Sequence, residues 1–248
     1  MNKEKLNSLI ARTEKPTRYM GGELNMRMKD EYEFRFALCF PDTYEIGMSH
    51  LGSRIVYNVL NNRSDTFCER AFAPWVDMEK LLREENEKLF SIETKTPLDE
   101  FDIIGFSLLY EMCYTNLLNM LELSGIPLTT AERGDKYPLI VAGGPCVCNS
   151  EPLAEIVDVF FFGDGEELMN DFMDCYATCM HKGLSRHEML IELSKIKGIY
   201  VPSFYRAEYE NGEFSRLIKL EEAAPDAVTR RIVRDLDKAE FTGDLIVP

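Results

Sequence analysis

Short apolar runs that alternate with segments of helical periodicity restrict the fold of this chain more than any other feature of its sequence. Residues 47–60, for example, place apolar side chains at helical spacing between two such runs. Nearly continuous apolar strands joined by amphipathic helices are typical of a parallel sheet covered on both faces. The sequence therefore predicts a doubly wound, mainly parallel α/β domain. The expected strands are residues 34–40, 67–73, 101–109, 138–142 and 157–162.

The chain divides into three predicted parts. They are an N-terminal arm at residues 1–30, the α/β domain at residues 31–180 and an α+β extension at residues 181–248. In the extension, Ser185 and Glu188 form the capping-box pattern of a helix start. Residues 209–214 contain an Asn-Gly pair, which favours a tight hairpin turn. A further extended piece is expected at residues 89–94, on an edge of the sheet.

Composition and charge argue against several classes of protein. The 248 residues include 28 Lys+Arg against 43 Asp+Glu, and the formal net charge of −15 disfavours binding to nucleic acid or anionic membranes. No apolar stretch approaches the roughly 18 residues of a membrane helix. Residues 1–20 lack the apolar segment of a signal peptide. We therefore expect a cytoplasmic protein that binds neither membrane nor nucleic acid.

The seven cysteines do not indicate a disulfide framework, because their number is odd and no secretion signal precedes them. The close pairs Cys146/Cys148 and Cys175/Cys179 lack the paired C-x-x-C spacing of a structural zinc site. We expect most of these cysteines to be small buried apolar residues, and we predict no metal site.

Four loops that follow predicted strands form the candidate site. Ligands of open α/β sheets bind beyond the carboxyl ends of the strands, where the strand order reverses. Three of the loops contain glycine, which lets a ligand approach the backbone. Each glycine taken alone is explained as well by a tight turn or by helix packing, but their coincidence at one edge favours a site. The loops are residues 41–52, 107–111, 143–145 and 163–166.

The sequence contains none of the common catalytic motifs. A P-loop, H-E-x-x-H and G-x-S-x-G are missing, and residues 163–168 lack the third glycine of a dinucleotide fingerprint. His50, His181 and His187 are dispersed, so no nucleophile and base are paired. His50 lies near a helix start and is expected to be a surface or capping residue. We predict no catalytic residue and interpret the chain as a binding domain.

Three short motifs at strand ends resemble the cobalamin-binding domain that precedes the catalytic barrel in one class of radical S-adenosylmethionine (SAM) enzymes. That domain carries D-x-H-x-x-G, S-x-L and G-G in this order. Here they read Asp42-Thr-Tyr44-Glu-Ile-Gly47, Ser107-Leu-Leu109 and Gly143-Gly144. Longer stretches are similar to an uncharacterised bacterial family of radical SAM iron–sulfur proteins, and the resemblance covers essentially the whole chain. These stretches are residues 18–24, 72–75, 110–116 and 163–167.

The resemblance implies a flavodoxin-like fold and a cobalamin site. The nucleotide tail of cobalamin would lie between the first and third strands, with Gly47 and Ser107 on its flanks. Gly143 and Gly144 would give it room, and the corrin would lie over residues 42–47. The implied cofactor-binding residues are Asp42, Tyr44, Gly47, Ser107, Leu109, Gly143 and Gly144. Glu111 and Glu166 are further residues that this picture places near the pocket or, equally, in solvent as helix caps.

Two departures from the family pattern change what is expected. Tyr44 replaces the histidine that would coordinate cobalt, so cobalamin would bind without histidine ligation. The cluster motif C-x-x-x-C-x-x-C is missing, and Cys175 and Cys179 have no third cysteine at that spacing. The apolar end at residues 245–248 suggests a chain cut from a longer one. A 4Fe–4S cluster and SAM are thus expected only in the full-length protein, whose radical SAM barrel would be the partner of this otherwise inactive domain.

Two alternatives remain open at this stage. One is a degenerate domain that has lost cobalamin, as Tyr44 permits, and recruits substrate or docks a partner. The other is a flavodoxin-like domain that binds flavin or a nucleotide at the same edge of the sheet. The substrate, the reaction and the oligomeric state do not follow from the sequence.

Overall fold

A computed structural model describes residues 3–235, 237 and 239, and within them six strands form one sheet in the order β2-β1-β3-β4-β5-β6. The first five strands are parallel and β6 is antiparallel to β5. This order is that of a doubly wound, flavodoxin-like sheet, as the sequence predicts. The strands are β1 (Phe34–Phe40), β2 (Thr66–Phe72), β3 (Ile103–Ser107), β4 (Leu139–Gly143), β5 (Val159–Phe161) and β6 (Ile199–Tyr200).

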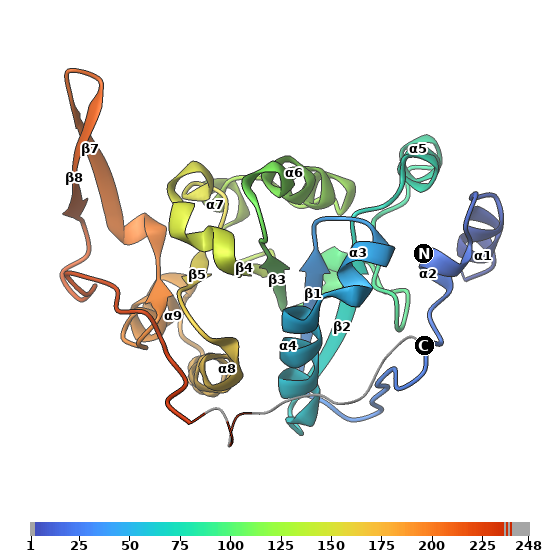
Figure 1. The fold of residues 1–248 in the computed structure, drawn as a ribbon, viewed down its shortest axis with the longest axis horizontal. Helices are drawn as coiled ribbons and strands as arrows, with labels where there is room; N and C mark the ends of the chain where they lie inside the picture. The colour runs from blue at the N-terminus through green and yellow to red at the C-terminus, as the bar shows by residue number, and fades with distance from the viewer. Residues whose placement is uncertain (1–2, 236, 238, 240–248) are drawn as a thin grey trace.

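Helices cover both faces of the sheet (Figure 1). The helices are α1 (Lys3–Ala11), α2 (Thr17–Met20), α3 (Tyr44–Ser49), α4 (Leu51–Asn62), α5 (Val76–Glu84), α6 (Tyr114–Leu123), α7 (Thr130–Arg133), α8 (Gly165–His181) and α9 (Arg186–Ser194). Helices α4 and α8 lie on one face, and α5, α6 and α7 lie on the other. Helix α9 packs against α8 and β6, and α1 packs against α5. The parallel strands therefore have no solvated face.

Burial on both faces explains why the strands are apolar without alternation. On β1, Phe36 and Leu38 belong to the core under α4 and α8. The intervening Ala37 and Cys39 belong to the opposite core under α5 and α6. Because successive strand residues point to opposite faces, both sets must be apolar.

Strand β2 is an exception, because it carries two charged side chains inside the protein. Glu69 is completely buried and accepts hydrogen bonds from Ser91 Oγ (2.7 Å) and the Thr94 backbone N–H (3.0 Å). Arg70 pairs with buried Glu93, with 2.6 Å between Arg70 Nε and Glu93 Oε1. Burial raises the pKa of the Glu93 carboxyl, although Arg70 opposes this effect. These polar groups hold the loop after α5 against the edge of the sheet.

The extended edge piece predicted at residues 89–94 is wrong as a strand. Phe90 forms only an isolated bridge with Pro97, and Lys95 has a φ of +63° that turns the chain back. The physical reason is that the Arg70 backbone N–H donates to the Glu93 carboxylate (2.7 Å). The Ile92 backbone N–H still donates to Arg70 O (2.7 Å), but the Glu93 side chain takes the Arg70 N–H, so the ladder of a strand does not continue.

The extension contains the elements that its sequence predicts. The Ser185 hydroxyl and the Glu188 carboxylate form the expected capping box at the start of α9. Strands β7 (Tyr205–Glu210) and β8 (Glu213–Lys219) form a hairpin that projects from the body in Figure 1. Its turn residues Asn211 and Gly212 have φ of +54° and +85°, as a type I′ turn requires.

Two further expectations concern membrane-spanning helices and the apolar end of the chain. Among the described residues, every helix is too short or too polar to cross a lipid bilayer. The apolar end at residues 245–248 lies outside the described residues.

A buried ion pair on the α7 side makes a testable contribution to stability. Arg133 and Asp158 side chains are almost fully buried, 3.2 Å apart, and Arg133 Nη1 also donates to Leu128 O (2.6 Å). We predict that Arg133→Met lowers the free energy of unfolding by about 3 kcal/mol, because the buried Asp158 carboxylate then loses its nearest cation and keeps only the longer contact with Arg186 (3.6 Å). Urea unfolding measures the loss. The control Arg83→Met, which breaks solvent-exposed pairs, should cost about 1 kcal/mol or less; equal losses would contradict this interpretation.

Candidate functional site

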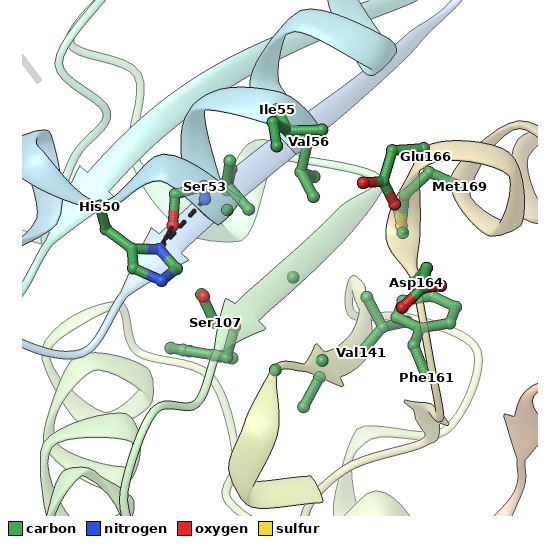
Figure 2. Close-up of a pocket in the computed structure, with 18 of the residues that line it drawn as sticks. His50, Ser53, Ile55, Val56, Ser107, Val141, Phe161, Asp164, Glu166 and Met169 are labelled. Carbon is green, nitrogen blue, oxygen red and sulfur yellow. Dashed lines mark hydrogen bonds between the residues drawn. The ribbon is translucent and has the colours of Figure 1, made fainter. Parts of the chain in front are cut away.

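A pocket of about 330 Å³ opens at the carboxyl ends of the central strands, between α4 and α8. It lies above β3, β4 and β5, and its walls are the first turns of the two helices (Figure 2). Parallel strands bring the loops that follow them to one edge, so this position follows from the topology. The volume falls within the range of about 300–1,000 Å³ that is typical of small-molecule sites.

The pocket has an apolar floor and two polar ends. The floor consists of strand and helix side chains, which are Phe36, Leu38, Ile55, Val56, Val141, Phe161 and Met169. At one end lie His50, Ser53 and Ser107, and at the other lie Asp164 and Glu166 (Figure 2). An apolar cavity with a few convergent polar groups is typical of sites for flat organic ligands.

Gly143 and Gly144 contribute to the pocket in different ways. Gly144 has a φ of +113°, and a Cβ there would lie 2.5 Å from the Leu108 carbonyl oxygen, so the backbone itself requires glycine. Gly143 has no such requirement, since a Cβ would meet only Phe161, at an ordinary 3.6 Å. A side chain at Gly143 would instead occupy the pocket. Close packing and backbone conformation thus explain why residue 144 is glycine. At residue 143 glycine instead keeps the pocket open.

His50 is held in one orientation at the polar end of the pocket. Its Nδ1 accepts a hydrogen bond from the Ser53 backbone N–H (3.1 Å) and lies 2.9 Å from the Ser53 hydroxyl. The ring also packs against Phe40, with 5.4 Å between the ring centroids. Burial lowers the pKa of the imidazole, which favours the neutral form. His50 is therefore the helix cap that its sequence position predicts, and it also lines the pocket.

The chain beyond the hairpin fixes the opposite wall of the pocket. Arg231 forms a parallel bridge with Gly163, and its guanidinium pairs with Glu167 (2.8 Å) and Asp171 (2.9 Å) on α8. The Val233 backbone N–H donates to the Asp164 carboxylate (2.9 Å). Residues 231–233 thus support the loop that leads into α8.

Within the first loop of the candidate site, His50 and Gly52 line this pocket, whereas residues 42–47 do not. Gly47 packs under Phe72, because a Cβ would lie 2.3 Å from the Phe72 ring, and close packing explains this glycine. The Tyr44 hydroxyl donates to Glu23 (2.9 Å), and burial and Glu23 together raise the pKa of its phenol above the ordinary range. Asp42 accepts a hydrogen bond from Tyr110 and raises the pKa of that phenol to about 12.

The structure thus separates the predicted site residues into two groups. Ser107, Gly143 and Gly144 line the pocket. Asp42, Tyr44 and Gly47 lie in the segment after β1 and do not line it, and Leu109 packs against the hydrophobic core under α4 and α8. The pocket therefore lies nearer to β4 and β5 than the position between Gly47 and Ser107 that the sequence predicts.

Sequence reasoning missed other residues of the pocket. His50 was expected only as a cap or surface residue, and Ser53 and Met169 occupy helix positions that resemble ordinary surface or core positions. The only signal in the sequence is that ligands bind beyond the carboxyl ends of parallel strands. This rule identifies the loops after the strands but not side chains one turn into a helix. Among residues 3–235, 237 and 239, no three His, Cys, Asp or Glu side chains form a group that could hold a metal ion.

Comparison with known proteins identifies a family. A family model described as radical SAM proteins, N-terminal, matches residues 52–202, which is more than half of the chain. The matched segment contains Ser107, Gly143 and Gly144 and begins after the Asp42–Gly47 loop. No curated protein and no solved structure matches the chain.

The two adjacent glycines should respond differently to the same substitution. We predict that Gly144→Ala lowers the free energy of unfolding by about 1–3 kcal/mol, because its backbone conformation and the Leu108 carbonyl exclude a side chain. Gly143→Ala should stay within about 1 kcal/mol of the parent protein. Chemical denaturation of both variants measures the contrast. A large loss for Gly143→Ala would mean that packing, not the pocket, requires that glycine.

The lowered pKa of His50 predicts a pH-dependent stability. The unfolded chain takes up a proton near the ordinary pKa of about 6.5, whereas the folded protein takes it up only at lower pH. The contribution of His50 is therefore complete above about pH 6.5 and falls as the pH decreases through that window. His50→Gln should flatten the dependence of unfolding free energy on pH there, relative to an exposed His187→Gln control. An unchanged slope in His50→Gln would disagree with a neutral, buried imidazole.

Proposed function

This chain belongs to the family of N-terminal domains of radical SAM proteins, and on that basis we propose that its pocket between α4 and α8 holds the nucleotide tail of cobalamin. The observation that carries the proposal is the open space above Gly143. Neither the backbone conformation nor packing requires glycine at this position. A cofactor tail that enters between the two helices would use this space.

The shape and chemistry of the pocket support such an occupant. The floor offers Phe36, Val141 and Phe161 to a flat aromatic base. Ser107 and His50 provide hydrogen-bonding groups for the polar part of a nucleotide. The residues present therefore fit a nucleotide tail. The corrin ring is proposed to lie outside the pocket, over the edge that contains Asp42 and α3.

Tyr44 is not positioned to act as a cobalt ligand in this proposal. Its hydroxyl donates to Glu23, and its ring packs at an edge-to-face angle of 72° on Phe72. Burial and Glu23 raise its pKa, so a phenolate does not form near neutral pH. Cobalamin would bind without an axial ligand from this residue. When bound, the cofactor supplies methyl-transfer or radical chemistry, while the protein supplies orientation and access.

An exposed apolar rim next to the pocket supports a partner domain at the same edge. The rim consists of exposed side chains from helix α3, from the starts of α4 and α5, and from the segments that follow β2 and β3, which are Ile46, Leu51, Trp75, Val76, Tyr110 and Met112. Val76 is 70% exposed and Met112 is 81% exposed. Clustered exposed apolar side chains mark interaction surfaces. We assign this rim to the radical SAM barrel of the full-length protein, which would close over the cofactor.

Equilibrium dialysis with hydroxocobalamin tests the proposal. We expect the chain to retain the corrin spectrum, and Gly143→Leu to weaken binding at least tenfold, because leucine would fill the pocket. The matched control is Lys136→Leu, which lines a different cavity that includes Asp102 and Arg186. That control should bind as the parent does.

Two outcomes would contradict the proposal. One is a parent chain that remains free of corrin at millimolar hydroxocobalamin, which would favour a degenerate docking domain. The other is flavin released from the purified protein on denaturation, which would favour a flavodoxin-type binder.

A further inference from the structure

The polar end formed by His50, Ser53 and Ser107 differs chemically from the end formed by Asp164 and Glu166. Ser53 donates to His50 Nδ1 through its backbone N–H, so this nitrogen is an acceptor without a proton. In a neutral imidazole the proton must then reside on Nε2. Among the described residues, His50 Nε2 has no hydrogen-bond partner. It is therefore a hydrogen-bond donor with a fixed tautomer at the pocket.

Neighbouring groups hold this donor in place before any ligand arrives. Gly52 lies against the ring, because a Cβ at Gly52 would be 2.9 Å from His50 Cε1. Phe40 packs on the ring from the strand side. In Figure 2 the Ser107 hydroxyl, at the end of β3, turns toward the same end of the pocket as the His50 ring. A rigid N–H and a rotatable O–H thus converge there.

Charge determines which part of a nucleotide each end can accept. Asp164, which pairs with Arg230 (3.4 Å), and Glu166 lie at the end opposite His50 in Figure 2, and of the two only Glu166 has no cation paired with it among the described residues, so this end disfavours an anion. The His50 end carries no acidic side chain among the pocket-lining residues. The apolar floor lies between the two ends. A nucleotide would therefore place its base on the floor and its negative oxygen near His50.

We propose that His50 and Ser107 bind a phosphate-ester oxygen of the nucleotide tail, and so select cobalamin over corrinoids that lack the tail. This inference rests on the proposed cobalamin site. His50 acts in it as a neutral donor, so that binding requires no charged imidazole.

Titrations of hydroxocobalamin and of diaquocobinamide, which has no nucleotide tail, test this inference. For the parent chain we expect tighter binding of hydroxocobalamin than of cobinamide. His50→Phe should weaken hydroxocobalamin binding about tenfold, the size of one lost hydrogen bond to a charged group, and leave cobinamide binding unchanged. His50→Gln, which retains an N–H donor, should recover most of the affinity. His187→Phe, an exposed histidine on α9, is the matched control.

The results separate this inference from the proposed function. If the parent binds hydroxocobalamin but His50→Phe weakens both corrinoids equally, or neither, the assignment of His50 is wrong and the site stands. If the parent binds neither corrinoid, both proposals fail. Because His50 caps α4, circular dichroism must show that each variant is folded. Should His50→Phe unfold, Ser107→Ala provides the same comparison, with selective loss of hydroxocobalamin affinity expected and unchanged affinity overturning the inference.

Discussion

Burial of the central sheet on both faces is the constraint on which the rest of this structure depends. Successive side chains of β1 enter opposite cores, so both faces must be covered by helices, and the strand is apolar except for Arg35, which pairs with buried Glu69. Crossover connections then return every parallel strand in the same direction. The loops after the strands consequently meet at one edge. The pocket, the apolar rim and the Asp42 loop are neighbours for this reason alone.

The fold followed from the sequence because its main signals are local. Apolar runs, helical periodicity, the Ser185–Glu188 box and the Asn-Gly turn each act within a few residues. The prediction for residues 89–94 was wrong because their conformation depends on a tertiary contact. In this contact the Arg70 backbone N–H donates to the Glu93 carboxylate. No local pattern reveals that a charged side chain will take the place of a strand.

The site was only partly predictable for a related reason. Glycines look alike in sequence, but Gly47 accommodates Phe72 and Gly144 accommodates a backbone turn, whereas Gly143 has room for a side chain. The three glycines can be distinguished only when the atoms that would surround a side chain at each position are known. His50 similarly combines a capping role, which sequence indicates, with a place in the pocket, which depends on how α4 crosses the sheet.

The central claim is that the space between α4 and α8 receives the tail of cobalamin, and methyl NMR tests it most directly. With methyl-labelled protein, addition of hydroxocobalamin should shift the methyl resonances of Ile55, Val56 and Val141 on the pocket floor. Methyl groups distant from the pocket, such as those of Ile126 in the core on the opposite face of the sheet, should remain unchanged. Binding that leaves the floor resonances in place, or that shifts only distant methyl groups, would contradict the account.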